Sequence, residues 1–173
     1  MKTTEPQFVK YFIGALYSDA KLLELAISHC EQGIGKIDLR SEPFPFDVTS
    51  YYDDEMGDTI SRVIFSFDTL FSPGDLAHLK TMCNKIEDEL MVGGSRKVNL
   101  DIGYLDFHKL VLASAKYNGQ KIYLDQGIYA DSTLYFEGGR FHAFENTFPD
   151  FKSNTYHDVF LKIRTTYKVQ LKT

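Results

Sequence analysis

The sequence lacks the features that would place it in several protein classes. It has 2 cysteines in 173 residues, Cys30 and Cys83, without the CxxC spacing of a zinc site. No apolar run approaches the ~20 residues that a membrane span requires, and the first residues lack the apolar stretch of a signal peptide. We therefore expect a soluble, cytoplasmic protein with no membrane partner.

The sequence also has fewer basic than acidic residues. Lys and Arg number 19 against 24 Asp and Glu, which gives a formal net charge of −5. This balance argues against a protein that neutralises nucleic-acid phosphates. No cluster of aromatic residues with flanking basic residues resembles the base-stacking motifs of RNA-binding sheets. Nucleic acid is therefore not an expected partner.

Motifs of the common enzyme classes are missing as well. The sequence contains no GxSxG, HExxH or GxxxxGK[ST] pattern, and its 5 histidines are scattered without metal-ligand spacing. Both cysteines fall on the apolar stripe of a predicted helix, where a free cysteine acts as a small buried hydrophobe. The sequence therefore marks no catalytic residue by a local motif.

The elements that are present can be located from periodicity and from turn residues. Ser72-Pro73-Gly74-Asp75 combines a serine cap with a proline at the first helical position, which predicts a helix that stops before Gly93-Gly94. Gly138-Gly139 predicts a tight hairpin turn. The remaining predicted helices cover 20–32, 107–116 and 158–171, and the predicted strands cover 8–17, 36–40, 60–70, 97–104, 121–125, 128–136 and 140–145.

The order of these elements predicts the fold class. The first six are strand, helix, strand, strand, helix and strand, which matches the split β-α-β pattern of ferredoxin-like folds. We therefore predict one α+β domain over residues 1–173 with a ferredoxin-like core and a mostly antiparallel sheet, extended by a C-terminal β-hairpin and closed by a terminal helix. A parallel βαβαβ sheet is the alternative, and the absence of a helix between the second and third strands disfavours it.

Four stretches of the sequence together carry a resemblance to a known family. They are SEPFPFD (41–47) with Tyr51-Tyr52 and Glu55-Met56-Gly57, VNLDIGYL (98–105) with KLVLA (109–113), Ile122-Tyr123-Leu124 with Gly127-Ile128-Tyr129-Ala130, and Phe148-Pro149-Asp150-Phe151. With these stretches the chain resembles an uncharacterised bacterial family, the domain-of-unknown-function family 4416. The resemblance implies a stand-alone cytosolic protein, and it supplies no activity and no catalytic or binding residues.

Acidic residues are concentrated between positions 38 and 58, where seven Asp and Glu face the single base Arg40. Several of these carboxylates could together hold a hard cation such as Mg²⁺, which prefers oxygen ligands. Glu42, Asp47 and Asp101 are the candidate ligands. The spacing of a calcium loop is absent, and solvated acids in a loop explain the cluster equally well.

The predicted irregular segment 41–59 also carries aromatic residues, namely Phe44, Phe46, Tyr51 and Tyr52. Aromatic rings beside a few polar groups are typical of a ligand pocket. An exposed aromatic loop can instead recognise a protein partner. The segment therefore supports two hypotheses, a small-molecule pocket and a protein interaction loop.

Polar residues alternate along two predicted strands. Asn99 and Asp101 share one face of their strand, and Tyr129 and Asp131 share one face of theirs. If the strands are close in the sheet, Asp101 and Asp131 could form a site with Lys109 or Arg62 as the counter-charge. The alternative is an ordinary solvated sheet face.

These observations lead to one preferred hypothesis and one alternative. We predict small-molecule binding or hydrolysis at a carboxylate and aromatic pocket; the alternative is a non-catalytic interaction module that uses segment 41–59. A homo-oligomer, in which the basic C-terminal helix contacts the acidic loop of another copy, is a further hypothesis. The candidate ligand-binding residues are Glu42, Phe44, Phe46, Asp47, Tyr51, Tyr52, Asn99, Asp101, Tyr104, Lys109, Tyr129 and Asp131.

Overall fold

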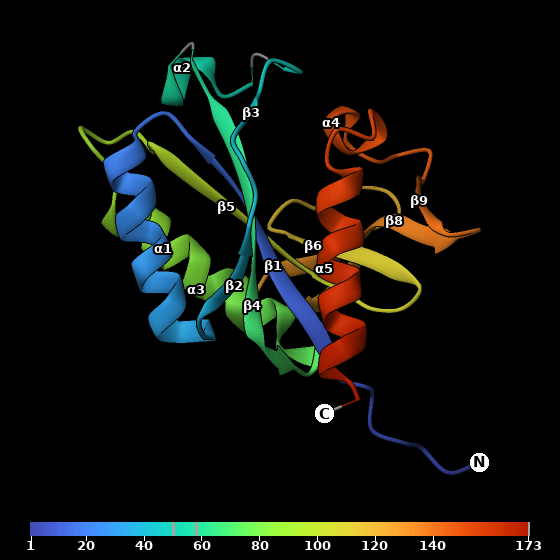
Figure 1. Cartoon of the computed structure of the whole chain (residues 1–173). Helices are drawn as coiled ribbons and strands as arrows, with labels where there is room; N and C mark the ends of the chain where they lie inside the picture. The colour runs from blue at the N-terminus through green and yellow to red at the C-terminus, as the bar shows by residue number, and fades with distance from the viewer. Residues whose placement is uncertain (50, 58, 173) are drawn as a thin grey trace.

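The computed structural model describes residues 1–49, 51–57 and 59–172, and these form one sheet with helices on both faces (Figure 1). The strands are β1 (Val9–Tyr17), β2 (Ile37–Arg40), β3 (Phe44–Pro45), β4 (Ser61–Phe71), β5 (Val98–Leu105), β6 (Lys109–Ser114), β7 (Ile122–Asp125), β8 (Ile128–Glu137) and β9 (Arg140–Ala143). The helices are α1 (Ala20–Ile34), α2 (Asp53–Met56), the 3₁₀ turn η1 (Pro73–Asp75), α3 (Leu76–Glu89), α4 (Pro149–Lys152) and α5 (His157–Gln170).

The sheet runs in the order β2-β4-β1-β5-β6-β8-β7, with β3 beside β4 and β9 beside β8. Each of these strand pairs is antiparallel. The prediction of an α+β protein with a mostly antiparallel sheet is therefore confirmed. Strand β1 lies between β4 and β5, and its Gly14 is paired with Ile64 on one side and Asp101 on the other.

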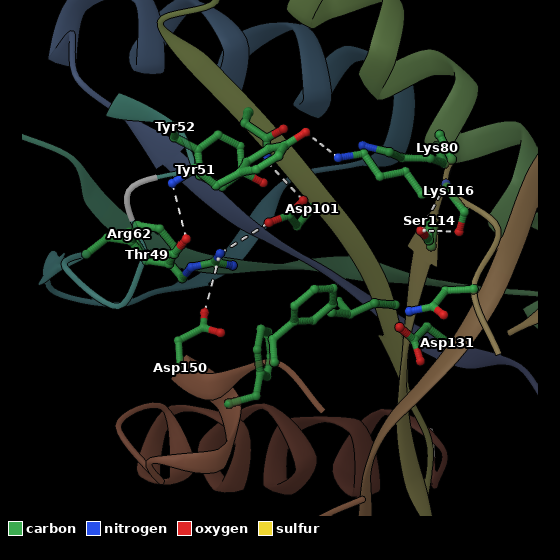
Figure 2. A pocket seen from close by; sticks show the side chains of 18 of the residues that line it. Thr49, Tyr51, Tyr52, Arg62, Lys80, Asp101, Ser114, Lys116, Asp131 and Asp150 are labelled. Carbon is green, nitrogen blue, oxygen red and sulfur yellow. Dashed lines mark hydrogen bonds and ion pairs between the residues drawn. The ribbon is translucent and has the colours of Figure 1, made fainter. Parts of the chain in front are cut away.

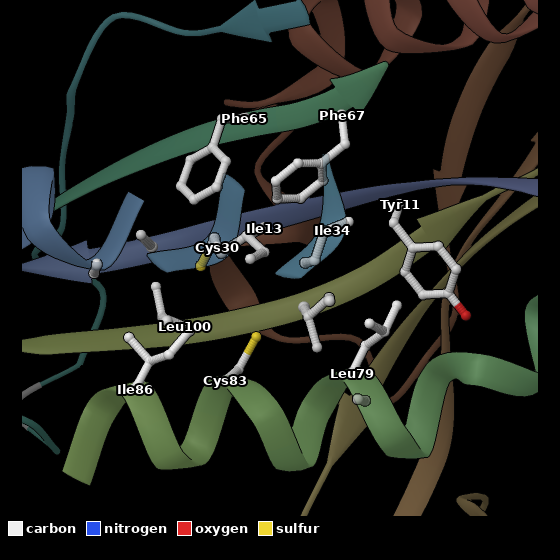
Figure 3. Packing of buried hydrophobic residues seen from close by; sticks show 14 of the residues in the cluster. Tyr11, Ile13, Cys30, Ile34, Phe65, Phe67, Leu79, Cys83, Ile86 and Leu100 are labelled. Carbon is white, nitrogen blue, oxygen red and sulfur yellow. The ribbon is translucent and has the colours of Figure 1, made fainter. Parts of the chain in front are cut away.

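The two faces of the sheet carry separate hydrophobic cores. Helices α1 and α3 cover one face, where Cys30 and Cys83 lie among buried aliphatic and aromatic side chains (Figure 3). Helix α5 covers the other face, where Phe12 of the central strand packs edge-on against Phe160. Both cysteines are free and buried, so their prediction as core residues is confirmed.

Local capping chemistry explains where the long helices begin. The Asp19 side chain accepts hydrogen bonds from the backbone N–H groups of Lys21 and Leu22 at the start of α1. The Ser72 side chain accepts one from Gly74, and Pro73 opens the 3₁₀ turn that leads into α3. The helix predicted from the Ser72-Pro73 signal is therefore present.

The helix predicted over 107–116 is wrong, because this segment forms the strand β6. The Asp106 carboxylate accepts hydrogen bonds from the N–H groups of His108 and Lys109, as a helix cap would, but here it closes the hairpin between β5 and β6. Residues 110–113 are all buried because both faces of β6 are covered, so the strand shows no alternation of apolar and polar residues.

Segment 41–59 contains β3 and α2 and folds back against the sheet. The N–H of Phe46 donates to the carbonyl of Ile60, and Phe46 packs with Leu16, Met56 and Ile60 in a small separate core. The partly buried Tyr52 packs against that core. These contacts place the aromatic part of the segment beside the ends of β1, β4 and β5.

Candidate functional site

A cavity of about 470 Å³ opens where this segment meets the C-terminal part of the chain (Figure 2). Its walls come from parts of the sequence that lie far apart: the described residues of segment 46–52, Arg62 of β4, the inner edge of α3 with β5, the connection from β6 to β7, Asp131 of β8, and residues 148–151. Both aromatic rings and charged side chains line it. The site is therefore assembled by the tertiary fold and not by any one loop.

Arg62 of β4 lies at one wall of the cavity and is 4% exposed. Its Nη2 lies 3.2 Å from the Asp101 carboxylate of β5 and 3.4 Å from the Asp150 carboxylate of α4. The side chain reaches Asp101 across the backbone of β1. At that crossing stands Gly14, where an added Cβ would lie 2.8 Å from the Arg62 Nη1. The missing side chain at Gly14 therefore makes room for the guanidinium.

Three aromatic rings surround the same guanidinium. The Arg62 Cζ lies 5.2 Å from the ring centre of Phe46, 5.6 Å from that of Phe151 and 5.7 Å from that of Tyr156. The Nε and Nη1 atoms of Arg62 are buried without a hydrogen-bond partner among the described residues. Burial alone would lower the pKa of Arg62, but the two nearby carboxylates outweigh it and raise this pKa. The cation is therefore held charged by two acids and three rings.

Asp150 is the more buried of the two acids, at 4% exposure. Pro149 opens the short helix α4, so Asp150 stands in its first turn, and the Tyr156 hydroxyl donates to its carboxylate over 3.2 Å. Burial raises the pKa of Asp150, although the Arg62 cation and the Tyr156 hydrogen bond lower it. This carboxyl group therefore holds a proton more tightly than an exposed aspartate does.

Asp101 is the more accessible acid, with its side chain 28% exposed. One carboxylate oxygen accepts from Arg62 and the other accepts from the Asn99 amide over 2.9 Å. The nearby Asp101 charge also helps to raise the pKa of Tyr52, for which burial is the larger cause. Asp101 is thus a fixed, partly exposed hydrogen-bond acceptor in the cavity wall.

A second ionic network forms the side of the cavity next to α3. Arg96 donates to Glu55 over 2.7 Å and to Glu87 over 3.0 Å, and its Nη1 also donates to the side-chain amide oxygen of Asn99. The Lys80 ammonium lies 3.4 Å from the Glu87 carboxylate and donates to a backbone carbonyl of β5. The hydrogen bond with Arg96 is the largest cause of the lowered pKa of Glu55.

The connection from β6 to β7 supplies the opposite wall. The Lys121 ammonium donates to the Ser114 hydroxyl over 2.9 Å and lies 3.6 Å from the Asp131 carboxylate. The exposed Lys116 reaches across to the other side, where its ammonium contacts the hydroxyl and the ring of Tyr51. Residues that are 65 positions apart thereby meet at the cavity.

Half of the residues proposed from the sequence line this cavity. They are Phe46, Tyr51, Tyr52, Asn99, Asp101 and Asp131. Of the two counter-charges proposed from the sequence, Lys109 and Arg62, it is Arg62 that pairs with Asp101. Asp131 pairs with Lys121 instead.

The other six candidates lie outside the cavity lining. Glu42 and Asp47 are exposed, and Phe44 packs edge-on against Tyr156. Tyr104 and Lys109 border a separate hollow of about 220 Å³ near the β5–β6 turn, where Lys109 pairs with Asp106. Tyr129 packs edge-on against Tyr123 of β7 and is tilted against Tyr117 of the connection from β6 to β7.

The arrangement offers no ready-made metal centre in the part of the chain that is described. No group of three or more His, Cys, Asp or Glu side chains there is placed to hold an ion. Glu42, Asp47 and Asp101, the three ligands considered for Mg²⁺, do not form such a group.

Several cavity residues were not proposed from the sequence. Lys80 and Glu87 each follow a buried apolar residue by four positions, which puts them on the same side of α3 as Leu76 and Cys83. Charged residues on the apolar side of a helix are the signal that could have identified them. Asp150 could have been identified from the Phe-Pro-Asp-Phe stretch, whose proline marks a helix start.

Comparison with known proteins gives a family and no activity. A family model described as "Domain of unknown function (DUF4416)" matches residues 7–167, and the chain belongs to this family. No curated protein and no solved structure gives a significant match. Among the described residues, none of the helices has the length and apolar character needed to cross a membrane.

Proposed function

We propose that the protein binds a small organic molecule in the cavity between segment 46–52 and residues 148–151. The observation that carries this proposal is the convergence of aromatic rings and fixed polar groups from distant segments of the chain on one cavity of about 470 Å³. Ligand pockets combine mostly apolar walls with a few precisely placed polar groups. Asp101, held by Arg62 and Asn99, is such a group.

The interaction-module hypothesis has less support from the same segment. Phe46 is 9% exposed and Tyr52 is partly buried, so both rings contribute to the cavity wall instead of an outer surface. The exposed large apolar residues of the segment are Val48 and Tyr51. Two such residues make a small patch in comparison with the several hundred Å² that a protein partner needs. We therefore favour the ligand pocket.

The test is a fragment screen by saturation-transfer NMR on the wild-type protein and two tryptophan variants. Asn84 is half-buried on α3 and lines the cavity, so Asn84→Trp fills it. Asn146 is exposed in the turn after β9 and does not line the cavity, so Asn146→Trp is the matched control. The proposal expects fragment signals that Asn84→Trp removes and Asn146→Trp retains. Absent signals, or signals that both folded variants retain, would refute it.

A hydrolytic activity is a second candidate, and one observation favours it. Asp101 and Asp150 both contact the same nitrogen of Arg62, and burial raises the pKa of Asp150. Two carboxyl groups in different environments can divide the roles of general base and general acid. Nitrophenyl esters, phosphates and glycosides should then release nitrophenol, and Asp150→Asn should abolish turnover while fragments still bind. No turnover of any of these probes by the wild-type protein would argue for binding alone.

Two further proposals concern the fold and the compartment. We propose that the unit β1-α1-β2-β4-α3-β5 is ferredoxin-like; the antiparallel order β2-β4-β1-β5 and the location of α1 and α3 in one core support this. We also propose a cytoplasmic location. The neighbouring free thiols of Cys30 and Cys83 support a reducing compartment.

A further inference from the structure

The charged side chains that line the cavity are paired with opposite charges, with one exception. Asp101 and Asp150 pair with Arg62, and Asp131 pairs with Lys121. Glu87 pairs with both Lys80 and Arg96. These contacts account for four carboxylates and four of the five cations in the cavity lining. The fifth cation is Lys116.

Lys116 has no carboxylate partner among the described residues. Its ammonium contacts the Tyr51 hydroxyl and lies 4.2 Å from the centre of the Tyr51 ring. A neutral hydroxyl and a ring quadrupole compensate an ammonium charge only in part, since an exposed cation–π contact contributes about 0.5–1 kcal/mol. Lys116 is therefore the one cation of the described cavity lining that pairs with no carboxylate, and it is located on an exposed side chain.

Exposed aromatic rings lie close to this charge along the chain and across the cavity. Tyr51 is 61% exposed, Tyr117 is 74% exposed and Phe148 is 48% exposed, and all three line the cavity. They come from three different segments, and each leaves a large apolar surface in contact with water. A ligand that covers these rings would remove that surface from water.

We infer that the ligand of this cavity is an organic anion, whose carboxylate or phosphate group binds the Lys116 ammonium and whose planar apolar part contacts Tyr51, Tyr117 and Phe148. This inference rests on the proposed function and specifies its ligand class. A cationic ligand would meet carboxylates that already have partners and would be repelled by Lys116. A neutral ligand would leave the Lys116 charge uncompensated.

Four small probes that share one ring and differ in charge test this inference. Benzoate and phenyl phosphate are the two anionic probes, and benzylamine and benzyl alcohol are the cationic and neutral controls. We expect at least one anion to bind about tenfold more tightly than either control in NMR titrations at low salt, which corresponds to about 1.4 kcal/mol. The two anions compared with each other show whether carboxylate or phosphate is preferred.

Three variants assign the preference to one side chain. Lys116→Met removes the charge and should reduce the affinity for the anion about tenfold, to the level of benzyl alcohol. Lys116→Arg should retain the preference. The control Lys36→Met removes an exposed lysine that does not line the cavity and should leave every affinity unchanged.

The outcomes separate this inference from the proposed function. Equal binding of all four probes, or an anion preference that persists in Lys116→Met, would overturn the inference although the cavity still binds ligands. If these probes and the fragment library all fail to give signals sensitive to Asn84→Trp, the proposed function itself is refuted. Anion binding that Lys116→Met removes and Lys36→Met retains would support both.

Discussion

Two buried cations on neighbouring strands, Lys10 and Arg62, differ in how many of their N–H groups have hydrogen-bond partners. Lys10 of β1 is fully buried, and its ammonium donates to the Asp38 carboxylate over 2.6 Å, to the Phe67 carbonyl over 2.6 Å and to Gln170 over 2.8 Å. Arg62 of β4 is 4% exposed but leaves Nε and Nη1 without hydrogen-bond partners among the described residues. Both link the sheet to the C-terminal helices.

The difference indicates what each cation does. Every N–H of the Lys10 ammonium has a partner from a different part of the fold, so this lysine fastens α5 and β2 to the central strands. Arg62 instead holds two acids at a cavity wall, and one of them, Asp101, is partly exposed. Arg62 therefore positions acids of the cavity wall, whereas Lys10 joins elements of the fold.

The largest expected effect is on Lys10. Lys10→Met leaves Asp38 without its cation and should reduce the free energy of unfolding by about 3–5 kcal/mol, as breaking a buried ion pair does. Arg62→Met should cost less, about 2 kcal/mol, since Asp101 opens on the cavity and Asp150 can take up a proton. Urea unfolding of both variants measures this difference. A larger loss for Arg62→Met than for Lys10→Met would contradict the comparison.

The next effect concerns the glycine beneath Arg62. Gly14→Ala would bring a Cβ to 2.8 Å from the Arg62 Nη1 and should cost about 1–2 kcal/mol. In the Arg62→Met background the cost should fall below about 0.5 kcal/mol, since the guanidinium is gone. Gly103→Ala is the control: its Cβ would lie 2.5 Å from the backbone carbonyl of Val111, so its cost should not depend on residue 62.

A smaller effect is expected on the pH dependence of the free energy of unfolding, through the ionisation of Asp150. Its pKa in the folded protein lies above the ordinary 3.8, so the folded state binds this proton more tightly than the unfolded chain. The stability that this contributes is fully present at low pH and is lost as the pH rises from about 4 through the folded pKa. Asp150→Asn removes the titration. Wild-type protein should therefore lose stability relative to Asp150→Asn as the pH rises above about 4, and a constant difference in the free energy of unfolding would be inconsistent with a raised pKa.

The smallest effect is expected for an exposed ion pair. Arg40 and Glu24 meet at 2.6 Å, but their side chains are 41% and 57% exposed. Exposed pairs contribute about 0–1 kcal/mol because water screens them. Arg40→Met should therefore change the free energy of unfolding by about 0.5 kcal/mol, and raising the salt concentration should remove the difference. A cost close to that of Lys10→Met would show that burial does not distinguish these cations.

Much of the fold could be predicted from local sequence signals. The Ser72-Pro73 start of α3, the alternation in β4 and β5, and the Gly138-Gly139 hairpin all correspond to elements of the structure. The failure at β6 has a physical cause. A strand buried on both faces has no polar alternation, and Asp106 caps a hairpin turn with the same hydrogen bonds that would start a helix.

The site could be predicted only in part. Phe46, Tyr52 and Asp101 were proposed as residues of a carboxylate and aromatic pocket, and they do line one cavity. Asp150 and Lys116 were not expected there, since the antiparallel addition of β6 and the return of α4 bring them to the cavity from distant positions. Periodicity contains no information on such long-range contacts.

The most direct test of a ligand site beside Arg62 is a crystal structure of the protein soaked with the fragment library. A binding cavity predicts that fragments gather between Phe46, Asp101 and Lys116, and that none replaces the partners of Lys10. Fragments spread over the surface, with none in this cavity, would contradict the assignment of a functional role to Arg62 and its two acids.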